Sequence, residues 1–171
     1  MARRKSSPRL VGWREWAALP DLGIPRIKAK LDTGAQTSAI HAWNVSPFDA
    51  GDQTWVRFEL HPQQRGRQDT VECEAPVVDQ RTIINSGGHR ERRYIIETSI
   101  RFGNEAWPIE LGLTDRDEMG FRLLIGRAAM RGRLIVDPDS SFRLGITDDG
   151  RQELSAPPIG AVAALKSEEE E

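Results

Sequence analysis

The stretch Leu31-Asp32-Thr33-Gly34-Ala35 decides the fold of this 171-residue chain. It follows from Ile27–Leu31, where apolar residues alternate with lysines as in a β-strand with one buried face. The strand delivers Asp32 into a small loop in which Gly34 lets the main chain turn and the Thr33 hydroxyl can form hydrogen bonds. Two such carboxylates, brought together, share one proton and can act as acid and base. The sequence holds one such loop, so a second must come from a second copy of the chain.

Period-two alternation recurs along the chain. The turn Gly103-Asn104 predicts one hairpin, and Asp137–Ser140 predicts another, with strands at Leu134–Val136 and Phe142–Ile146. Helical periodicity is limited to a short candidate at Arg127–Arg131. Many short strands joined by turns predict an all-β fold, closed or sandwiched. The other alternating segments are Val56–Leu60, Ile96–Phe102 and Trp107–Leu113.

Composition predicts one folded domain between two disordered ends. Hydrophobic residues make up 38% and charged residues 29%, as in an ordinary globular protein. The basic residues 1–8 and the acidic tail 151–171 lack a pattern that could bury a core, which leaves residues 9–150 as the domain. The net charge of −2 includes four glutamates at Glu168–Glu171, so the remainder carries −2 + 4 = +2 and does not favour a nucleic-acid partner.

The single cysteine, Cys73, rules out a disulfide within the chain and favours a reducing compartment. No apolar run follows the basic amino-terminal residues, and no segment reaches transmembrane length. We therefore expect a cytoplasmic protein without a membrane partner.

The order of three parts resembles that of retropepsins, the single-lobe aspartic peptidases of retroviral type. A strand ends in Asp32-Thr33-Gly34-Ala35, a β-rich region is centred on Ser86-Gly87-Gly88, and Leu123–Ile125 leads into Gly126-Arg127 and the helix candidate. The chain is most similar to a bacterial group of this class, labelled ATP-dependent zinc proteases and associated with ATP-grasp glutamate ligases. The segments that carry this likeness are Gly12–Trp16, Lys28–Ala35, Cys73–Asp79 and Met119–Arg127.

The resemblance implies a retropepsin-like closed barrel, in one lobe with one short C-terminal helix, and a role for each residue of the site. Arg127 lies where retropepsins have an arginine that pairs with an acid after the catalytic loop, but here that position is Gln36, which offers a hydrogen bond instead. The longer spacing between Asp32 and Gly126 places added length around residues 43–80. The implied roles are catalytic for Asp32, Thr33 and Gly34, substrate-binding for Ala35, Ser86, Gly87 and Gly88, and structural support for Gly126 and Arg127.

The activity implied by the resemblance is that of an aspartic endopeptidase working as a homodimer. One Asp32 would act as general base on a water and the other as general acid to the peptide carbonyl. Arginines outnumber acids by ten to seven between Arg81 and Arg133, which suits a glutamate-rich substrate but equally a solvated hairpin face. The alternative is a peptide-binding or regulatory partner of a ligase, in which Asp32 is structural.

The residue patterns predict neither a metal nor a cofactor. There is no His-Glu-x-x-His motif, no pair of cysteines and no Gly-x-x-x-x-Gly-Lys phosphate loop. His41, His61, His89 and Cys73 are scattered without the spacing of metal ligands. We expect His41 to pack beside the catalytic loop and Cys73 to be a small buried residue.

Overall fold

A computed structural model describes residues 7–62, 70–84, 87–115 and 120–145. The disordered ends predicted at residues 1–8 and 151–171 lie outside these ranges, apart from Ser7 and Pro8. So does Ser86 at the centre of the predicted flap.

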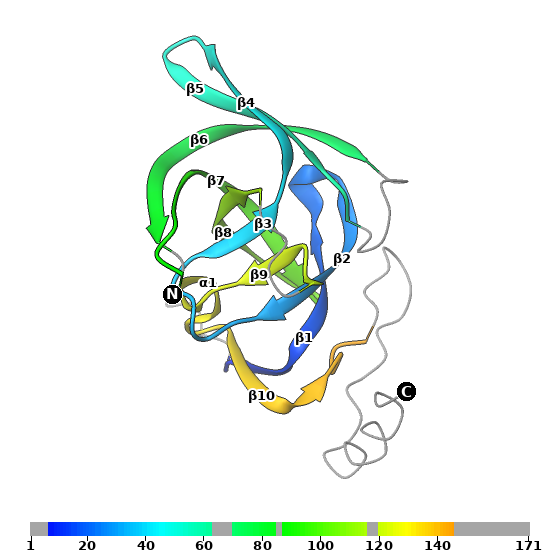
Figure 1. Cartoon of the computed structure of the whole chain (residues 1–171). Coiled ribbons are helices and arrows are strands. Elements are labelled where there is room, and N and C mark those ends of the chain that lie inside the picture. Colours follow the sequence, from blue (N-terminus) through cyan, green and yellow to red (C-terminus); the bar gives the residue numbers. More distant parts are fainter. Residues whose placement is uncertain (1–6, 63–69, 85–86, 116–119, 146–171) are drawn as a thin grey trace, which may run out of the picture.

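The described chain is built almost wholly of strands (Figure 1). The helices whose bounds the structure describes are a 3₁₀ turn, η1, and a four-residue helix, α1, and none of the described helices is long and apolar enough to cross a membrane. The elements are β1 (Arg9–Leu19), η1 (Pro20–Leu22), β2 (Ile24–Leu31), β3 (Ser38–His41), β4 (Trp43–Ala50), β5 (Gln53–Leu60), β6 (Val71–Ile84), β7 (Arg90–Phe102), β8 (Glu105–Thr114), β9 (Leu123–Ile125), α1 (Arg127–Met130) and β10 (Leu134–Ser141).

The strands form one sheet in the order β10-β1-β2-β9-β3-β8-β7-β6-β5-β4. An additional pairing of β1 with β7, at Ala18 and Arg101, closes part of the sheet into a ring. Closure satisfies the backbone groups that would otherwise be exposed at a sheet edge. The prediction of an all-β closed barrel with one short helix is confirmed.

The alternating segments bury the faces that the sequence predicts. Ile27, Ala29 and Leu31 of β2 are buried, while the lysines between them are only partly covered. The turn at Gly103 joins β7 to β8 as predicted, with Phe102 opposite Glu105. Burial of each large aliphatic side chain stabilises the fold by about 1.5–3 kcal/mol. The other buried alternating residues are Val56, Phe58, Leu60, Ile96, Thr98, Ile100, Phe102, Trp107, Ile109, Leu111 and Leu113.

The added length predicted at residues 43–80 forms β4, β5 and the first part of β6. The β4–β5 hairpin projects beyond the barrel (Figure 1), and most of the β4 side chains are exposed or half-buried. Phe48 and Trp55 face each other across this hairpin.

The hairpin predicted around Asp137–Ser140 is wrong. β10 runs without reversal from Leu134 to Ser141 and pairs in parallel with β1. The Asp137 carboxylate accepts hydrogen bonds from the Asp139 N–H, at 2.9 Å, and from the Ser140 hydroxyl, so these polar residues have partners without a turn. The chain turns later, where the Gly145 N–H donates to the Phe142 carbonyl. The helix α1 is accordingly followed by another strand of the barrel.

Candidate functional site

The Asp32 loop is fixed by the backbone of β9. β2 and β9 lie side by side in parallel, and the Asp32 N–H donates to the Ile125 carbonyl at 2.8 Å. Within the loop, the Gly34 N–H donates to Oδ1 of Asp32 at 2.9 Å, and the Ala35 N–H donates to the Asp32 carbonyl at 3.2 Å. Asp32 is half-buried. One carboxylate oxygen is therefore held by the loop itself.

Gly126 lets the loop pack directly on the start of α1. A Cβ atom at this position would lie 2.7 Å from the carbonyl carbon of Thr37 and 2.8 Å from the carbonyl oxygen of Gln36. The Gly126 N–H donates to Oγ of Ser38 at 3.0 Å, and the Arg127 N–H donates to the Ala35 carbonyl at 2.7 Å. The close approach thus depends on the absence of a side chain.

The Arg127 guanidinium completes the support. It donates to the Thr33 carbonyl at 3.0 Å and to Oε1 of Gln36 at 3.1 Å. Gln36 thus supplies the hydrogen bond expected in place of an ion pair. The structure brings Asp32, Thr33, Gly34, Ala35, Gly126 and Arg127 together, and their catalytic, binding and supporting roles stay predictions.

The predicted flap is the end of the β6–β7 hairpin, whose last paired residues are Ile84 and Arg90. Gly87 and Gly88 lie at its tip, both exposed, and Gly88 has a φ of 81°, which favours glycine. Gly87 and Gly88 belong to a different element from the Asp32 loop. Their part in substrate binding stays a prediction.

Glu91, one residue after the last paired residue at the tip, connects this end of the hairpin to the end of β8. Its carboxylate accepts from Arg93 at 2.8 Å, from the Thr114 hydroxyl at 3.0 Å and from the Asp115 N–H at 3.3 Å. Burial disfavours the charged carboxylate, but the hydrogen bond and charge of Arg93, helped by Thr114 and Asp115, outweigh it and lower the pKa of Glu91. Of the arginines predicted beside the tip, Arg93 is therefore a structural partner, whereas Arg90 and Arg92 are exposed.

A cleft of about 760 Å³ opens beside the loop, between α1 and β8. Gln36, Thr37 and Ser38 form one wall of it, while Asp32 is not part of its lining. Trp107 also lines the cleft, its Nε1 donates to the Ala129 carbonyl at 3.0 Å, and the Arg133 guanidinium lies 5.3 Å from its ring.

Two of the three histidines contact the same aromatic ring. His41 and His61 both contact Trp43, with ring centroids 3.8 Å and 4.0 Å away, and the Arg122 guanidinium lies 4.7 Å from the same ring. Cys73 is buried, as predicted, and burial raises the pKa of its thiol to about 11. Within the described ranges, no group of three histidine, cysteine or acidic side chains could hold a metal ion.

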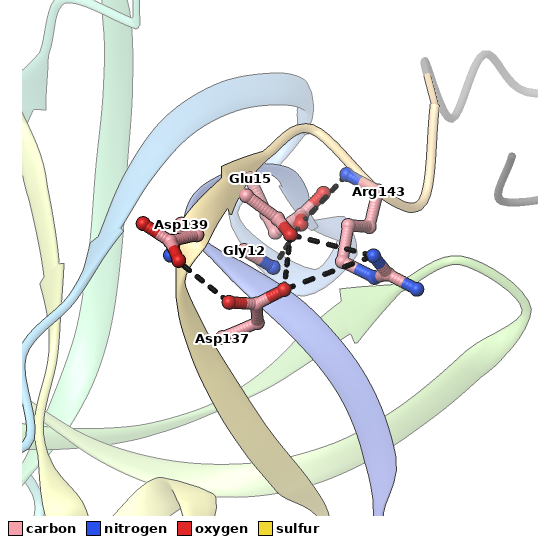
Figure 2. Close-up of polar contacts among 6 residues, drawn as sticks. Gly12, Glu15, Asp137, Asp139 and Arg143 are labelled. Carbon is pink, nitrogen blue, oxygen red and sulfur yellow. Dashed lines mark hydrogen bonds and ion pairs between the residues drawn. The ribbon is translucent and has the colours of Figure 1, made fainter. Parts of the chain in front are cut away.

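A buried carboxylate that the sequence reasoning missed lies on β1 (Figure 2). Glu15 is fully buried and accepts from the Gly12 N–H at 2.6 Å, the Arg143 N–H at 2.9 Å and the Leu144 N–H at 3.0 Å. Burial raises the pKa of Glu15, and the backbone donors and Arg143 only partly offset this. Its signal in the sequence was weak, an acid at a core-facing position of a strand. Glu15 therefore connects β1 to Arg143 and Leu144, the residues that follow β10.

A family model and several named proteins match this chain. A family model described as RimB-like, retropepsin-like aspartic endopeptidase RimB, matches residues 10–144. A protein of Shewanella pealeana named probable alpha-L-glutamate ligase is 50% identical over 140 residues, which cover 82% of this chain and 31% of the relative. A protein of Parasynechococcus marenigrum with the same name is 47% identical over 149 residues, covering 86% of this chain and 32% of the relative.

The fold has also been seen in a solved structure. The crystal structure of Lpg0085, a Legionella pneumophila protein of unknown function, superposes with a TM-score of 0.67 at 27% identity. The match covers 80% of this chain and 98% of that one.

The endopeptidase activity expected from the resemblance, and with it the assignment as a hydrolase or protease, is overturned by the names of these relatives. Proteins about half identical to this chain are named as glutamate ligases, enzymes that form a bond to glutamate, and not as peptidases. The chain spans only about a third of their length.

The order of the parts, the closed barrel and the Asp32 loop on β9 agree with the family match, which spans the whole described barrel. This chain belongs to the RimB-like family of retropepsin-like proteins.

Proposed function

We propose that this chain is the peptide-holding domain of an α-L-glutamate ligase system. The observation that carries the proposal is the 50% identity to about one third of a chain named as such a ligase. A domain that occurs within a ligase chain is available to bind the ligase or the peptide that receives glutamate. The proposed partner is an ATP-grasp glutamate ligase, and the proposed location is the cytoplasm, where Cys73 stays reduced.

The arrangement of the barrel supports a peptide-binding role. The Asp32 loop is a rigid turn, supported from behind by Gly126 and Arg127. On β7, Arg90 and Arg92 are exposed and, being two residues apart on a strand, share one face. Exposed guanidinium groups suit carboxylates, which they can bind in a bidentate manner. The proposed ligand is therefore a peptide that carries glutamates.

The experiment compares two fluorescently labelled peptides, octaglutamate and octaglutamine, in anisotropy titrations with the full chain. We expect saturable binding of octaglutamate that weakens severalfold in the double variant Arg90→Gln/Arg92→Gln. Arg131→Gln, which removes an exposed charge beside α1, is the matched control and should bind like the parent. Equal binding of both peptides, or equal binding by the double variant, would refute the proposal.

A second readout is the integrity of the peptide, followed by mass spectrometry during the same titration. The proposed role predicts that octaglutamate stays intact with the parent chain and with Asp32→Asn. Shortening of the peptide that disappears in Asp32→Asn would overturn a role confined to binding.

We also propose that the chain forms a homodimer through β10. This strand ends the sheet order, and within the described residues β1 is its only strand partner. Ile135 on β10 is 54% exposed and lies opposite Leu10 of β1, itself 38% exposed. An open edge with exposed apolar side chains favours pairing with another strand.

A further inference from the structure

The outer face of the β1–β2 ribbon carries four cationic side chains, which we call the cation strip: Arg14, Arg26, Lys28 and Lys30. The register places Arg14 opposite Lys30 and Trp16 opposite Lys28, so these four residues share one face. Arg26 lies on the same face because residues two apart on a strand point the same way. The strip ends at Lys30, two residues before Asp32, and none of its four residues lines the cleft beside α1.

Neither of these two strands carries an exposed acid. β2 contains no acidic residue, and the one acid of β1, Glu15, is fully buried on the opposite face. Arg26 is exposed, and Arg14, Lys28 and Lys30 are partly exposed. The two strands themselves therefore contribute only cations to this face.

Aromatic rings hold the cations in place. The Arg26 guanidinium lies 3.8 Å from the Trp16 ring centroid, and Nζ of Lys28 lies 5.7 Å from it. Trp16 stacks on Phe142, with centroids 5.6 Å apart, and the Arg14 guanidinium lies 5.0 Å from Phe142. Since Trp16 is already engaged by cations and by Phe142, the strip offers charge and not a bare ring for base stacking.

The spacing of the cations matches that of an extended acidic segment. Alternate side chains on a strand are about 6.8 Å apart, so Arg26, Lys28 and Lys30 form a row with that repeat. Alternate carboxylates of an extended glutamate run have the same repeat. Four consecutive glutamates, Glu168–Glu171, occur in this very chain.

The last described residues of the chain lie beside the strip. The Phe142 N–H donates to the Arg14 carbonyl at 2.9 Å, so the polypeptide lies against the strip three residues before Gly145, where the described residues end. The 23 residues from Gly145 to Glu168 can span at most about 80 Å. The connection is long enough for Glu168–Glu171 to return to Lys28 and Lys30.

We propose that the acidic run Glu168–Glu171 binds intramolecularly to the cation strip. Bound there, it occupies the strip and keeps other polyanions from it. The proposal is independent of the peptide-holding function, which concerns Arg90 and Arg92 on β7.

The lysine content of the chain permits a direct test. The chain has four lysines, Lys5, Lys28, Lys30 and Lys166, and two of them belong to the strip. A water-soluble carbodiimide joins a carboxylate to a lysine amine only when the two are in contact. After treatment of the full chain and tryptic digestion, we expect mass spectrometry to show Ser167–Glu171 linked to Lys28 or Lys30.

Arg14→Gln and Arg26→Gln leave the amines of Lys28 and Lys30 in place. Together the two substitutions remove half of the positive charge of the strip. Their double variant should reduce the cross-link severalfold, whereas Arg131→Gln should leave it unchanged. Added salt should also reduce the yield, because exposed charges are screened. Replacement of all four glutamates by glutamine should remove every cross-link made through a side-chain carboxylate and leave only a link through the terminal carboxylate of residue 171.

Three outcomes would overturn the proposal. One is a cross-link of the acidic run to Lys5 or Lys166 alone. In this case an added tetraglutamate peptide must still react with Lys28 and Lys30, which shows that both amines are reactive. Another is a cross-link that joins labelled to unlabelled chains in a mixture of ¹⁵N-labelled and unlabelled protein, because the occupant would then be a second copy. The third is binding of a single-stranded RNA oligonucleotide that is lost in Arg14→Gln/Arg26→Gln while the cross-link persists, since the strip would then be a nucleic-acid site.

Discussion

The Arg127 guanidinium donates a hydrogen bond of 3.1 Å to Oε1 of Gln36, on the far side of the loop that carries Asp32. The same guanidinium donates to the Thr33 carbonyl at 3.0 Å. One side chain after β9 therefore holds both ends of a loop that lies more than ninety positions earlier in the chain. Thr33, Gly34 and Gln36 are exposed, so packing contributes little to the position of the loop. The loop therefore depends on the hydrogen bonds from Arg127.

Arg127→Ala should loosen the Asp32 loop more than it destabilises the barrel. Two hydrogen bonds at a partly exposed site contribute only about 1 kcal/mol to the free energy of unfolding. Amide exchange at Gly34 and Ala35 should nevertheless accelerate by about tenfold or more, because the loop loses its outer support. Arg131→Ala is the matched control, and faster exchange in both variants would contradict a specific role for Arg127.

Gly126→Ala should destabilise the protein by about 2 kcal/mol or more, since the new methyl group would clash with the backbone of Gln36 and Thr37. Gly34→Ala is the contrasting variant. Its Cβ would meet only Oδ1 of Asp32, at 3.0 Å, and a side-chain atom can move. We expect a loss below about 1 kcal/mol for Gly34→Ala in urea unfolding. Equal losses for the two variants would mean that the close approach at Gly126 is not a constraint.

Sequence reasoning predicted the elements whose cause is local. In β2, β5, β7 and β8, alternation alone identifies the buried face, because a strand turns successive side chains to opposite sides. The Asp32 loop and the short helix after Gly126 were also found, with a difference of one residue at the helix end.

The failures concern residues whose partners are distant in the sequence. Asp137–Ser140 has the composition of a turn, but pairing with β1, more than 120 positions earlier, keeps β10 extended. Glu15 receives two of its hydrogen bonds from residues 128 and 129 positions later. No local sequence pattern predicts such contacts. The activity could not be read from the fold because one fold serves several functions.

The homodimer proposed through β10 predicts that sedimentation equilibrium will show a reversible monomer–dimer mixture over a concentration series. Ile135→Lys should shift it to monomer, because a lysine on an edge strand opposes pairing with another strand. Val78→Lys introduces the same charge at an apolar residue of β6 that is 48% exposed, and should leave the equilibrium unchanged. A parent protein that stays monomeric throughout the series would exclude this dimer.

The tip of the β6–β7 hairpin should open more readily than the barrel. Gly87 and Gly88 are exposed and lie beyond the last paired residues, Ile84 and Arg90, whereas Ile96–Phe102 pairs with β8 along its length and buries Ile96, Ile100 and Phe102 in the core. Hydrogen exchange read by NMR should be at least about a hundredfold faster at the two glycines than at Ile100. Similar protection at both places would argue against a mobile flap.

Glu15 should make stability depend on pH in an unusual direction. Burial raises its pKa in the folded state above the ordinary value of 4.5, so the folded protein binds this proton more tightly than the unfolded chain. The contribution of Glu15 is then fully present below pH 4.5 and is lost as the pH rises through the raised pKa of the folded state. Over this pH range the contribution of Glu15 to stability falls as the pH rises, whereas that of an ordinary carboxylate such as Glu91, whose pKa is lowered, does not.

Glu15→Gln removes the titrating group and keeps its size. An amide NH₂ cannot accept a hydrogen bond, so one of the N–H groups of Gly12, Arg143 or Leu144 loses its acceptor, at a cost of about 1–3 kcal/mol. Urea unfolding at a series of pH values from 4.5 upward should show the parent losing part of its advantage over Glu15→Gln as the pH rises. Asp139→Asn, at an exposed residue of β10, is the control and should follow the parent. A difference between the parent and Glu15→Gln that stays constant with pH would show that Glu15 keeps one ionisation state across this range.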